Sequence, residues 1–184
     1  MAQIKPKIAH LKNGREVTLR AGAEEDAPQL LATISTYISE NSGMVWEPDE
    51  CKKTDVEMRE WIRGMRENPI EVLILAIFDG KIVGNIDFHA GNRRRIAHVG
   101  EFGMGMLPEF RNKGLGSLLL ESMIEWAKQT AQLEKINLHV IDSNAQAIGL
   151  YRKFGFKEEG RRPRQFKYSD GNYADDVLMS KLIK

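Results

Sequence analysis

A short segment in the second half of the chain, residues 104–116 (MGMLPEFRNKGLG), has the residues of an anion-binding turn. Pro108 fixes a turn after a strand-like stretch, and Gly114 and Gly116 stand where a helix-like run begins. A helix N-terminus presents N–H groups without partners, and glycine lets a phosphate approach the backbone closely. The spacing is not that of a Walker A loop, and Leu119 stands where a dinucleotide fingerprint needs its third glycine. The segment predicts a phosphate-binding turn, with a plain strand–turn–helix connection as the alternative.

A second segment, residues 144–156, places a tyrosine on one narrow face of a predicted helix. A helix advances about 100° per residue, so Asn144, Ala147 and Tyr151 fall on one narrow face. Gly155 is a helix stop signal at its end. A tyrosine is protonated at neutral pH and can donate a proton. The alternative is a core tyrosine whose hydroxyl is hydrogen-bonded.

The two segments, as an ordered pair, resemble the GNAT superfamily of acyl-CoA-dependent N-acyltransferases. The pair is Arg111-x-x-Gly114-x-Gly116 followed by Asn144-x-x-Ala147-x-x-x-Tyr151-x-x-x-Gly155-Phe156. A likeness to the branch that holds ribosomal-protein, spermidine and small-molecule acetyltransferases comes from Glu101-Phe102-Gly103, Glu158-Glu159-Gly160 and Gly171-Asn172-Tyr173-x-Asp175. The resemblance spans residues 71–184, and the N-terminal third matches only in its strand–helix–helix order. It implies an N-acetyltransferase that takes its acetyl group from acetyl-CoA and needs no metal.

The resemblance also assigns a cofactor site. In similar proteins the backbone N–H groups of the turn hold the pyrophosphate of CoA, and this turn consists of Arg111, Asn112, Lys113, Gly114, Leu115 and Gly116. A bulged strand around Met104 and Met106 would pair with the pantetheine arm, which Asn144 would also contact. Arg152 or Lys153 would meet an outer phosphate, with a solvated helix face as the alternative for both.

The implied reaction is direct attack of a primary amine on the acetyl thioester, through a tetrahedral intermediate. An amine of a small molecule or a protein N-terminus must first lose a proton near pH 7. Glu101 is the candidate base, directly or through water, because related enzymes often carry an acid there; pairing with Arg95 or His98 is the alternative. Tyr151 is the candidate acid for the departing CoA thiolate. Backbone N–H groups at the bulge would polarise the thioester oxygen.

The other reactive side chains carry weaker signals. Cys51 is the single cysteine, which excludes an intrachain disulfide and a cysteine metal cluster. No metal-site spacing links the four histidines, which are His10, His89, His98 and His139. Cues to the acceptor conflict, because residues 46–50 (WEPDE) suit a cationic amine, whereas arginines within 93–95 and 161–164 suit a carboxylate or phosphate. The identity of the acceptor therefore stays open.

The rest of the sequence must form the elements that position these residues. Apolar patterns predict strands at 16–20, 72–78, 81–89, 95–107, 135–141, 156–166 and 173–182, and helices at 23–40, 54–66, 113–133 and 143–154. Glycines inside the strand at 95–107 indicate a bulge or a ligand against the backbone. Hairpins followed by a β-α-β-α-β run predict a mixed α/β (α+β) domain, whose mostly antiparallel twisted sheet has about seven strands flanked by about four helices. We expect this single domain at 14–184, after a flexible leader at 1–13.

Composition limits the function classes. The chain has 184 residues, with 27 Lys+Arg against 26 Asp+Glu, and this balance counts against a nucleic-acid-coating protein. Its longest wholly apolar run, residues 72–78, is far shorter than the ~20 residues of a transmembrane helix, and residues 1–14 lack the apolar core of a signal peptide. We therefore expect a cytoplasmic protein with neither a membrane nor a nucleic-acid partner.

Three functions remain in view. The first is an acetyl-CoA N-acetyltransferase, the second is a CoA-binding regulatory module without significant turnover, and the third is a nucleic-acid-binding domain built on the arginine runs. The sequence keeps the turn, Tyr151 and Glu101, which favours the enzyme. Closing strands in such folds often pair between subunits, so a homodimer stays open.

Overall fold

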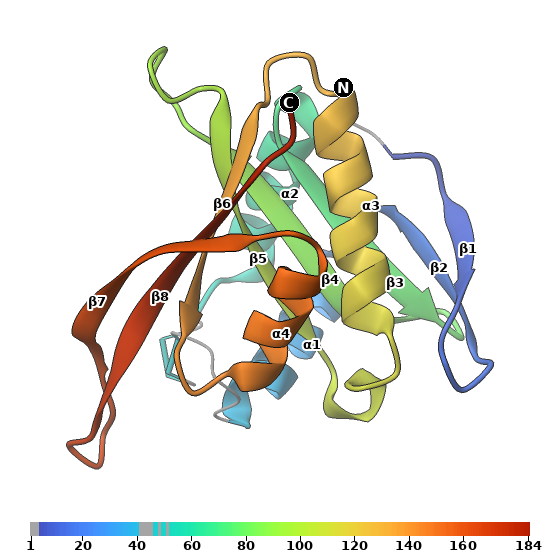
Figure 1. The fold of residues 1–184 in the computed structure, drawn as a ribbon. Helices are drawn as coiled ribbons and strands as arrows, with labels where there is room; N and C mark the ends of the chain where they lie inside the picture. The colour runs from blue at the N-terminus through green and yellow to red at the C-terminus, as the bar shows by residue number, and fades with distance from the viewer. Residues whose placement is uncertain (1–3, 41–45, 48, 51) are drawn as a thin grey trace.

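The computed structural model describes residues 4–40, 46–47, 49–50 and 52–184 as one sheet with helices on both faces (Figure 1). The order of its eight strands is β1-β2-β3-β4-β5-β6-β8-β7. The strands are β1 (Lys7–His10), β2 (Glu16–Ala21), β3 (Val72–Phe78), β4 (Lys81–Ala90), β5 (Val99–Met106), β6 (Lys135–Ile141), β7 (Lys157–Lys167) and β8 (Tyr173–Leu182). The helices are α1 (Ala27–Ser39), α2 (Asp55–Glu67), α3 (Leu115–Gln129) and α4 (Ala145–Lys153), with short 3₁₀ turns η1 (Glu24–Asp26) and η2 (Pro108–Phe110).

The predicted fold class is confirmed. Every pairing of the described strands is antiparallel except that of β5 with β6. The sheet has eight strands where about seven were expected, because β1 lies inside the segment taken as a leader and pairs with β2 from Lys7–Leu19 to His10–Glu16. A four-residue edge strand whose side chains are half-buried or exposed has a weak pattern, which is why the sequence does not reveal it.

Two apolar layers sandwich the sheet. Helix α3 and part of α4 pack on one face, where Ile74 and Leu119 are fully buried. Helices α1 and α2 pack on the other, where Leu75 and Ile62 are fully buried. Strand β3 is covered on both sides, and this explains why its sequence is continuously apolar instead of alternating.

Most helix ends follow the expected signals. Thr54 caps α2 in a reciprocal capping box, in which Glu57 N–H donates to Thr54 Oγ1 at 3.3 Å and Thr54 N–H donates to Glu57 Oε2 at 2.7 Å. Gly155, at φ +84°, follows the end of α4. Helix α3 begins two residues later than predicted, since Gly114 at φ +91° is its N-cap.

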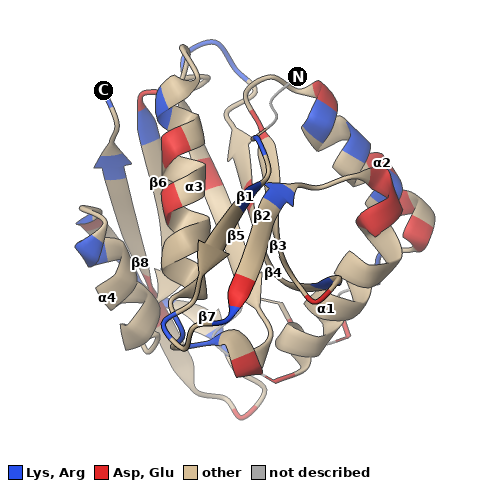
Figure 2. Cartoon of the chain, turned by 90° about the vertical axis from the view of Figure 1, so that its right-hand side faces the viewer, with Lys and Arg blue, Asp and Glu red and all other residues tan. Residues whose placement is uncertain are grey.

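Charges of both signs are interspersed on the surface of α2 (Figure 2). Within this helix the Arg59 Nε lies 2.7 Å from Asp55 Oδ2, one helical turn away. In the described part of the chain no helix is long and apolar enough to span a membrane.

Candidate active site

The central feature of the site is a gap between strands β5 and β6. Their register runs only from Val99–Lys135 to Glu101–Asn137, although β5 continues to Met106. Beyond Glu101 the edge of β5 that faces β6 therefore has no strand partner in the described register. A strand edge of this kind can hydrogen-bond to an extended ligand.

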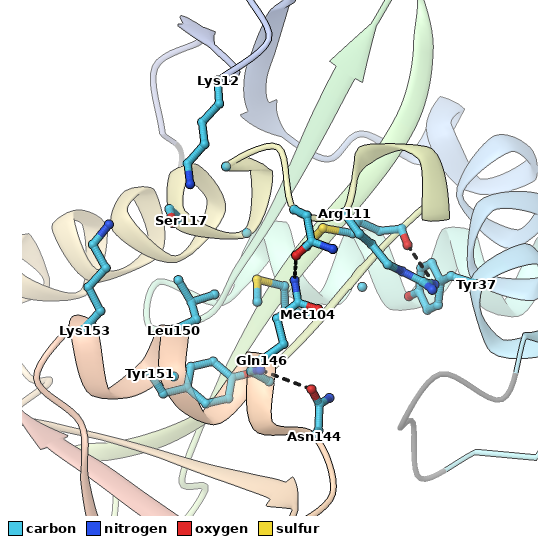
Figure 3. Close-up of a pocket in the computed structure, with 17 residues that line it drawn as sticks. Lys12, Tyr37, Met104, Arg111, Ser117, Asn144, Gln146, Leu150, Tyr151 and Lys153 are labelled. Carbon is cyan, nitrogen blue, oxygen red and sulfur yellow. Dashed lines mark hydrogen bonds between the residues drawn. The ribbon is translucent and has the colours of Figure 1, made fainter.

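A cavity of about 560 Å³ lies at this gap, where β5, the start of α3 and one side of α4 meet (Figure 3). Most of the predicted cofactor residues line it, and these are Met104, Met106, Arg111, Asn112, Gly114, Gly116 and Asn144. Tyr151 lines it too. Lys113, Leu115, Arg152 and Glu101 are not among its lining residues. The cavity thus unites two segments that lie about 30 residues apart in sequence.

The turn before α3 has the geometry of an anion site. Gly114 provides no side-chain cap, so the first N–H groups of α3 lack an acceptor within the helix. A Cβ on Gly116 would lie 3.2 Å from Met106 Cε and 3.3 Å from Leu150 Cδ2. A larger residue would therefore fill the space that glycine leaves beside the first turn of α3, which we call the cradle. Leu115 is fully buried and can offer only its backbone.

Basic side chains surround the same turn. The amino groups of Lys12 and Lys153 both point toward Ser117 at the start of α3 (Figure 3). Arg111 Nη1 lies 3.1 Å from Glu40 Oε2, at the other end of the cavity. Arg152 turns away, 62% exposed and 3.6 Å from Glu158 Oε2. Of the two basic residues predicted for an outer phosphate, Lys153 is therefore the one at the cavity.

Helix α4 is joined to the turn and presents Tyr151 to the cavity. Gln146 donates a hydrogen bond to Asn112 Oδ1, and the Asn144 side chain caps the helix by accepting from Ala147 N–H at 3.1 Å. The Tyr151 ring packs edge-on against Phe102, with centroids 5.6 Å apart. Tyr151 is only 8% exposed, and this burial raises its pKa to about 12. The phenol therefore keeps its proton at neutral pH.

Glu101 lies on the opposite face of the sheet from Tyr151. Successive residues of a strand alternate in direction, so Phe102 faces Tyr151 while Glu101 shares the α1 side with Gly105. The close approach of α1 confirms the direction, because a Cβ on Gly105 would lie 2.3 Å from the ring of Tyr37. The two predicted catalytic side chains thus approach the β5–β6 gap from its two sides.

The side chain nearest to Glu101 in charge-bearing contacts is His139, whereas the alternative to a catalytic role named Arg95 or His98 as its partner. Glu101 Oε1 lies 3.6 Å from His139 Nε2, and His139 Nδ1 lies 2.8 Å from Asp176 Oδ2. Asp176 is 1% exposed, and its Oδ2 is also 3.5 Å from Arg162 Nη1. Glu101, His139 and Asp176 thereby form a diagonal series across β5, β6 and β8, since Glu101 is opposite Asn137 and His139 is opposite Leu178. The sequence analysis gave His139 no role, since only the strand register brings these residues together.

A second polar cluster lies on the same face. His89 Nε2 is 3.3 Å from Asp87 Oδ2, and His89 Nδ1 is 3.6 Å from Glu71 Oε2. The hydrogen bond with Asp87 raises the pKa of His89 despite its partial burial. A Cβ on Gly103 would lie 3.2 Å from Asp87 Oδ2, so glycine leaves that carboxylate uncovered by β5.

Some residues that the sequence analysis singled out either lie outside the described part of the chain or are exposed at its surface. Cys51 and Pro48 lie outside the described residues. Trp46 is described and is 57% exposed. No group of three His, Cys, Asp or Glu side chains is placed to hold a metal ion within the described ranges.

Comparison with known proteins identifies the family. The model of the Acetyltransferase (GNAT) family matches residues 31–156. The chain belongs to the GNAT family. Family membership confirms the predicted class of enzyme, an acyl-CoA-dependent acetyltransferase.

Individual relatives agree with this assignment. The chain is 30% identical to L-amino acid N-acetyltransferase AaaT of Escherichia coli (strain K12), over 66% of the chain and 75% of the relative. It is 24% identical to an N-alpha-acetyltransferase of Sulfurisphaera tokodaii, over 91% of the chain and 95% of the relative. A crystal structure of a GNAT acetyltransferase from Streptococcus pneumoniae superposes with a TM-score of 0.88 at 32% identity, covering 90% of this chain and 99% of the other.

Proposed function

We propose that this protein transfers the acetyl group of acetyl-CoA to a primary amine at the gap between β5 and β6. The observation that carries the proposal is that the turn at Gly114–Gly116 and Tyr151 line one and the same cavity. The fit of the CoA moiety rests on the cradle at Gly116, which a Cβ would fill, and on the N-terminal N–H groups of α3. The unpartnered edge of β5 around Met104 and Met106 suits the extended pantetheine arm.

Bound acetyl-CoA would supply the activated acetyl group, and the side chains of the chain would move the protons. On the α1 face, the ammonium of the acceptor loses its proton to Glu101, directly or through water. His139 extends this path in the tautomer whose Nδ1–H donates to Asp176, because Nε2 is then unprotonated and directed at Glu101. The freed amine then forms the new N–C bond.

Tyr151 acts on the other side of the sheet. As the tetrahedral adduct collapses and the C–S bond breaks, the phenol donates its proton to the departing sulfur. The second proton that the nitrogen loses on becoming an amide passes to solvent, from which the phenol is reprotonated. Its pKa of about 12 supports a donor and argues against a base, because the phenol holds its proton in the resting enzyme. The separation of base and acid on two faces would allow the amine and the CoA to enter from opposite sides.

The acceptor is proposed as a primary amine of a small molecule or a protein N-terminus. Glu71, Asp87 and Glu101 on the acceptor face support a substrate that arrives as an ammonium ion. Relatives named for L-amino acids and for N-alpha groups support either kind of acceptor. We also propose a homodimer through β7, the edge strand that is exposed along most of its length, to be tested by light scattering.

The test combines binding with turnover. Acetyl-CoA at 100 times its Kd should add about 2.7 kcal/mol of stability, which raises the melting temperature by roughly 5–10 °C for a chain of this size. Release of CoA is then measured with polyamines, amino acids, aminoglycosides and N-terminal peptides. Binding without turnover on any amine would favour the alternative of a regulatory CoA-binding module. A melting temperature that does not respond to millimolar acetyl-CoA would refute both functions.

A further inference from the structure

The hairpin formed by β1 and β2 has a tip with fixed geometry. Leu11 is 3% exposed within the main core, and its N–H donates to the Arg15 carbonyl at 2.8 Å. Gly14, at φ +81°, closes the turn by donating to the Leu11 carbonyl at 2.9 Å. The Arg15 guanidinium lies over the ring of Phe78, 5.3 Å from its centroid. Lys12, which lies in this turn, is thereby held in a defined position.

The tip is docked on the anion-binding turn. The N–H of Lys12 donates to the carbonyl of Lys113 at 2.9 Å, a contact between residues about 100 positions apart. The stem of Lys12 crosses Gly114, because a Cβ there would be 3.4 Å from Lys12 Cγ. Gly114 therefore serves two purposes, the left-handed backbone of the N-cap and room for this lysine.

Lys12 and Lys153 differ from the other cations near the cavity. In the described part of the chain, neither amino group lies within 4.0 Å of a carboxylate. Arg111 pairs with Glu40, Arg152 pairs with Glu158, and the amino group of Lys113 bonds to the Glu109 carbonyl. Lys12 and Lys153 instead approach the start of α3 together (Figure 3).

We propose that the hairpin tip is part of the cofactor site, and that Lys12 binds a phosphate group of CoA together with Lys153. The inference rests on the proposed use of acetyl-CoA and adds a residue that the turn motif does not contain. Two ammonium groups beside free helix N–H groups suit the charge of a phosphate, since each charge-assisted bond is stronger than a neutral one. Sequence reasoning could not have found Lys12, because it lies in a turn that follows a short edge strand and matches no motif.

The test uses Lys12→Met, which removes the charge and keeps an apolar stem over Gly114. The control is Lys7→Met, the same change on the same hairpin, at a lysine that lies 3.1 Å from Glu125 and away from the cavity. Dissociation constants for acetyl-CoA are measured by calorimetry at 50 and 300 mM salt. We expect Lys12→Met to weaken binding about tenfold at low salt and less at high salt, Lys7→Met to leave it unchanged, and Lys12→Arg to restore most of it.

A second arm identifies the phosphate. If the effect of Lys12→Met disappears with 3′-dephospho-acetyl-CoA, Lys12 binds the 3′-phosphate, and if it persists, Lys12 binds the diphosphate. Independently of any variant, acetyl-CoA should slow amide hydrogen exchange in residues 7–19 of the wild-type protein. Affinity of Lys12→Met within twofold of wild type, or an equal loss in Lys7→Met, would overturn the inference. A wild-type protein that does not bind acetyl-CoA would instead contradict the proposed function itself.

Discussion

Replacing Tyr151 by phenylalanine is the sharpest test of the proposed chemistry. The substitution removes one hydroxyl and keeps the ring, which packs against Phe102 at 5.6 Å and Phe156 at 6.0 Å between centroids. Stability and acetyl-CoA affinity should therefore change little. A positioned general acid contributes about 10²–10⁴ in rate, so kcat should fall by that factor, or roughly 3–5 kcal/mol in activation free energy.

The pKa of Tyr151 sharpens the expectation further. Because burial raises that pKa to about 12, less than about 1% of the phenol is ionised at pH 9. The loss of kcat in Tyr151→Phe should therefore be the same from pH 6 to pH 9. Any basic limb that wild type shows in this range should persist in the variant, since it belongs to another group.

The assay is release of CoA under single-turnover conditions, which report the chemical step. Tyr173→Phe is the matched control, because it removes the same hydroxyl from an exposed ring on β8. The control should keep wild-type kcat. If Tyr151→Phe keeps more than about a third of wild-type kcat in the chemical step, Tyr151 is a packing residue and the proposed acid is wrong.

Three further predictions concern the base, the cradle and the second polar cluster. Glu101→Gln should lower kcat/KM most at pH 6–7 and less near pH 9, where more of the amine is already deprotonated, and acetyl-CoA affinity should not change. An altered melting temperature with an unaltered pH–rate profile would mean that Glu101 only holds His139 in place. Gly116→Val should fold, because its nearest contacts are flexible side-chain ends, but should lose the thermal shift with acetyl-CoA; a full shift would place the CoA elsewhere. Asp87→Asn should lower the pKa of His89 in an NMR titration, since its hydrogen bond raises that pKa. A His89 pKa that is higher in the folded than in the unfolded protein stabilises the fold below pH ~6.5, and this stabilisation is lost as pH rises through the folded-state pKa. The Asp87→Asn variant should therefore lose more stability at pH 6 than at pH 8.5. Equal losses at the two pH values would contradict the pairing of His89 with Asp87.

Local patterns in the sequence were sufficient for most elements. The bounds of β3, β6 and β8 coincide with the ranges predicted for them. Thr54 and Gly155 mark helix ends through bonds and dihedral angles within a few residues. The strand predicted from residue 95 begins instead at Val99, since the Ile96 N–H donates to the Arg93 carbonyl and forms a turn. The turn that we propose as the phosphate site was also recognisable in the sequence, because its glycines and its helix start are contiguous.

Tertiary structure decided which distant residues share the site. Glu101, His139 and Asp176 meet only because β5, β6 and β8 adopt one register, and a shift of one residue would point each side chain to the other face. The rotation of α4 selects Lys153 over Arg152 at the cavity. Lys12 reaches Gly114 through a hydrogen bond that spans about 100 residues of sequence. Periodicity in a sequence predicts which face of an element is buried, but pairing, register and helix rotation follow from packing between elements, and these set the geometry of the site.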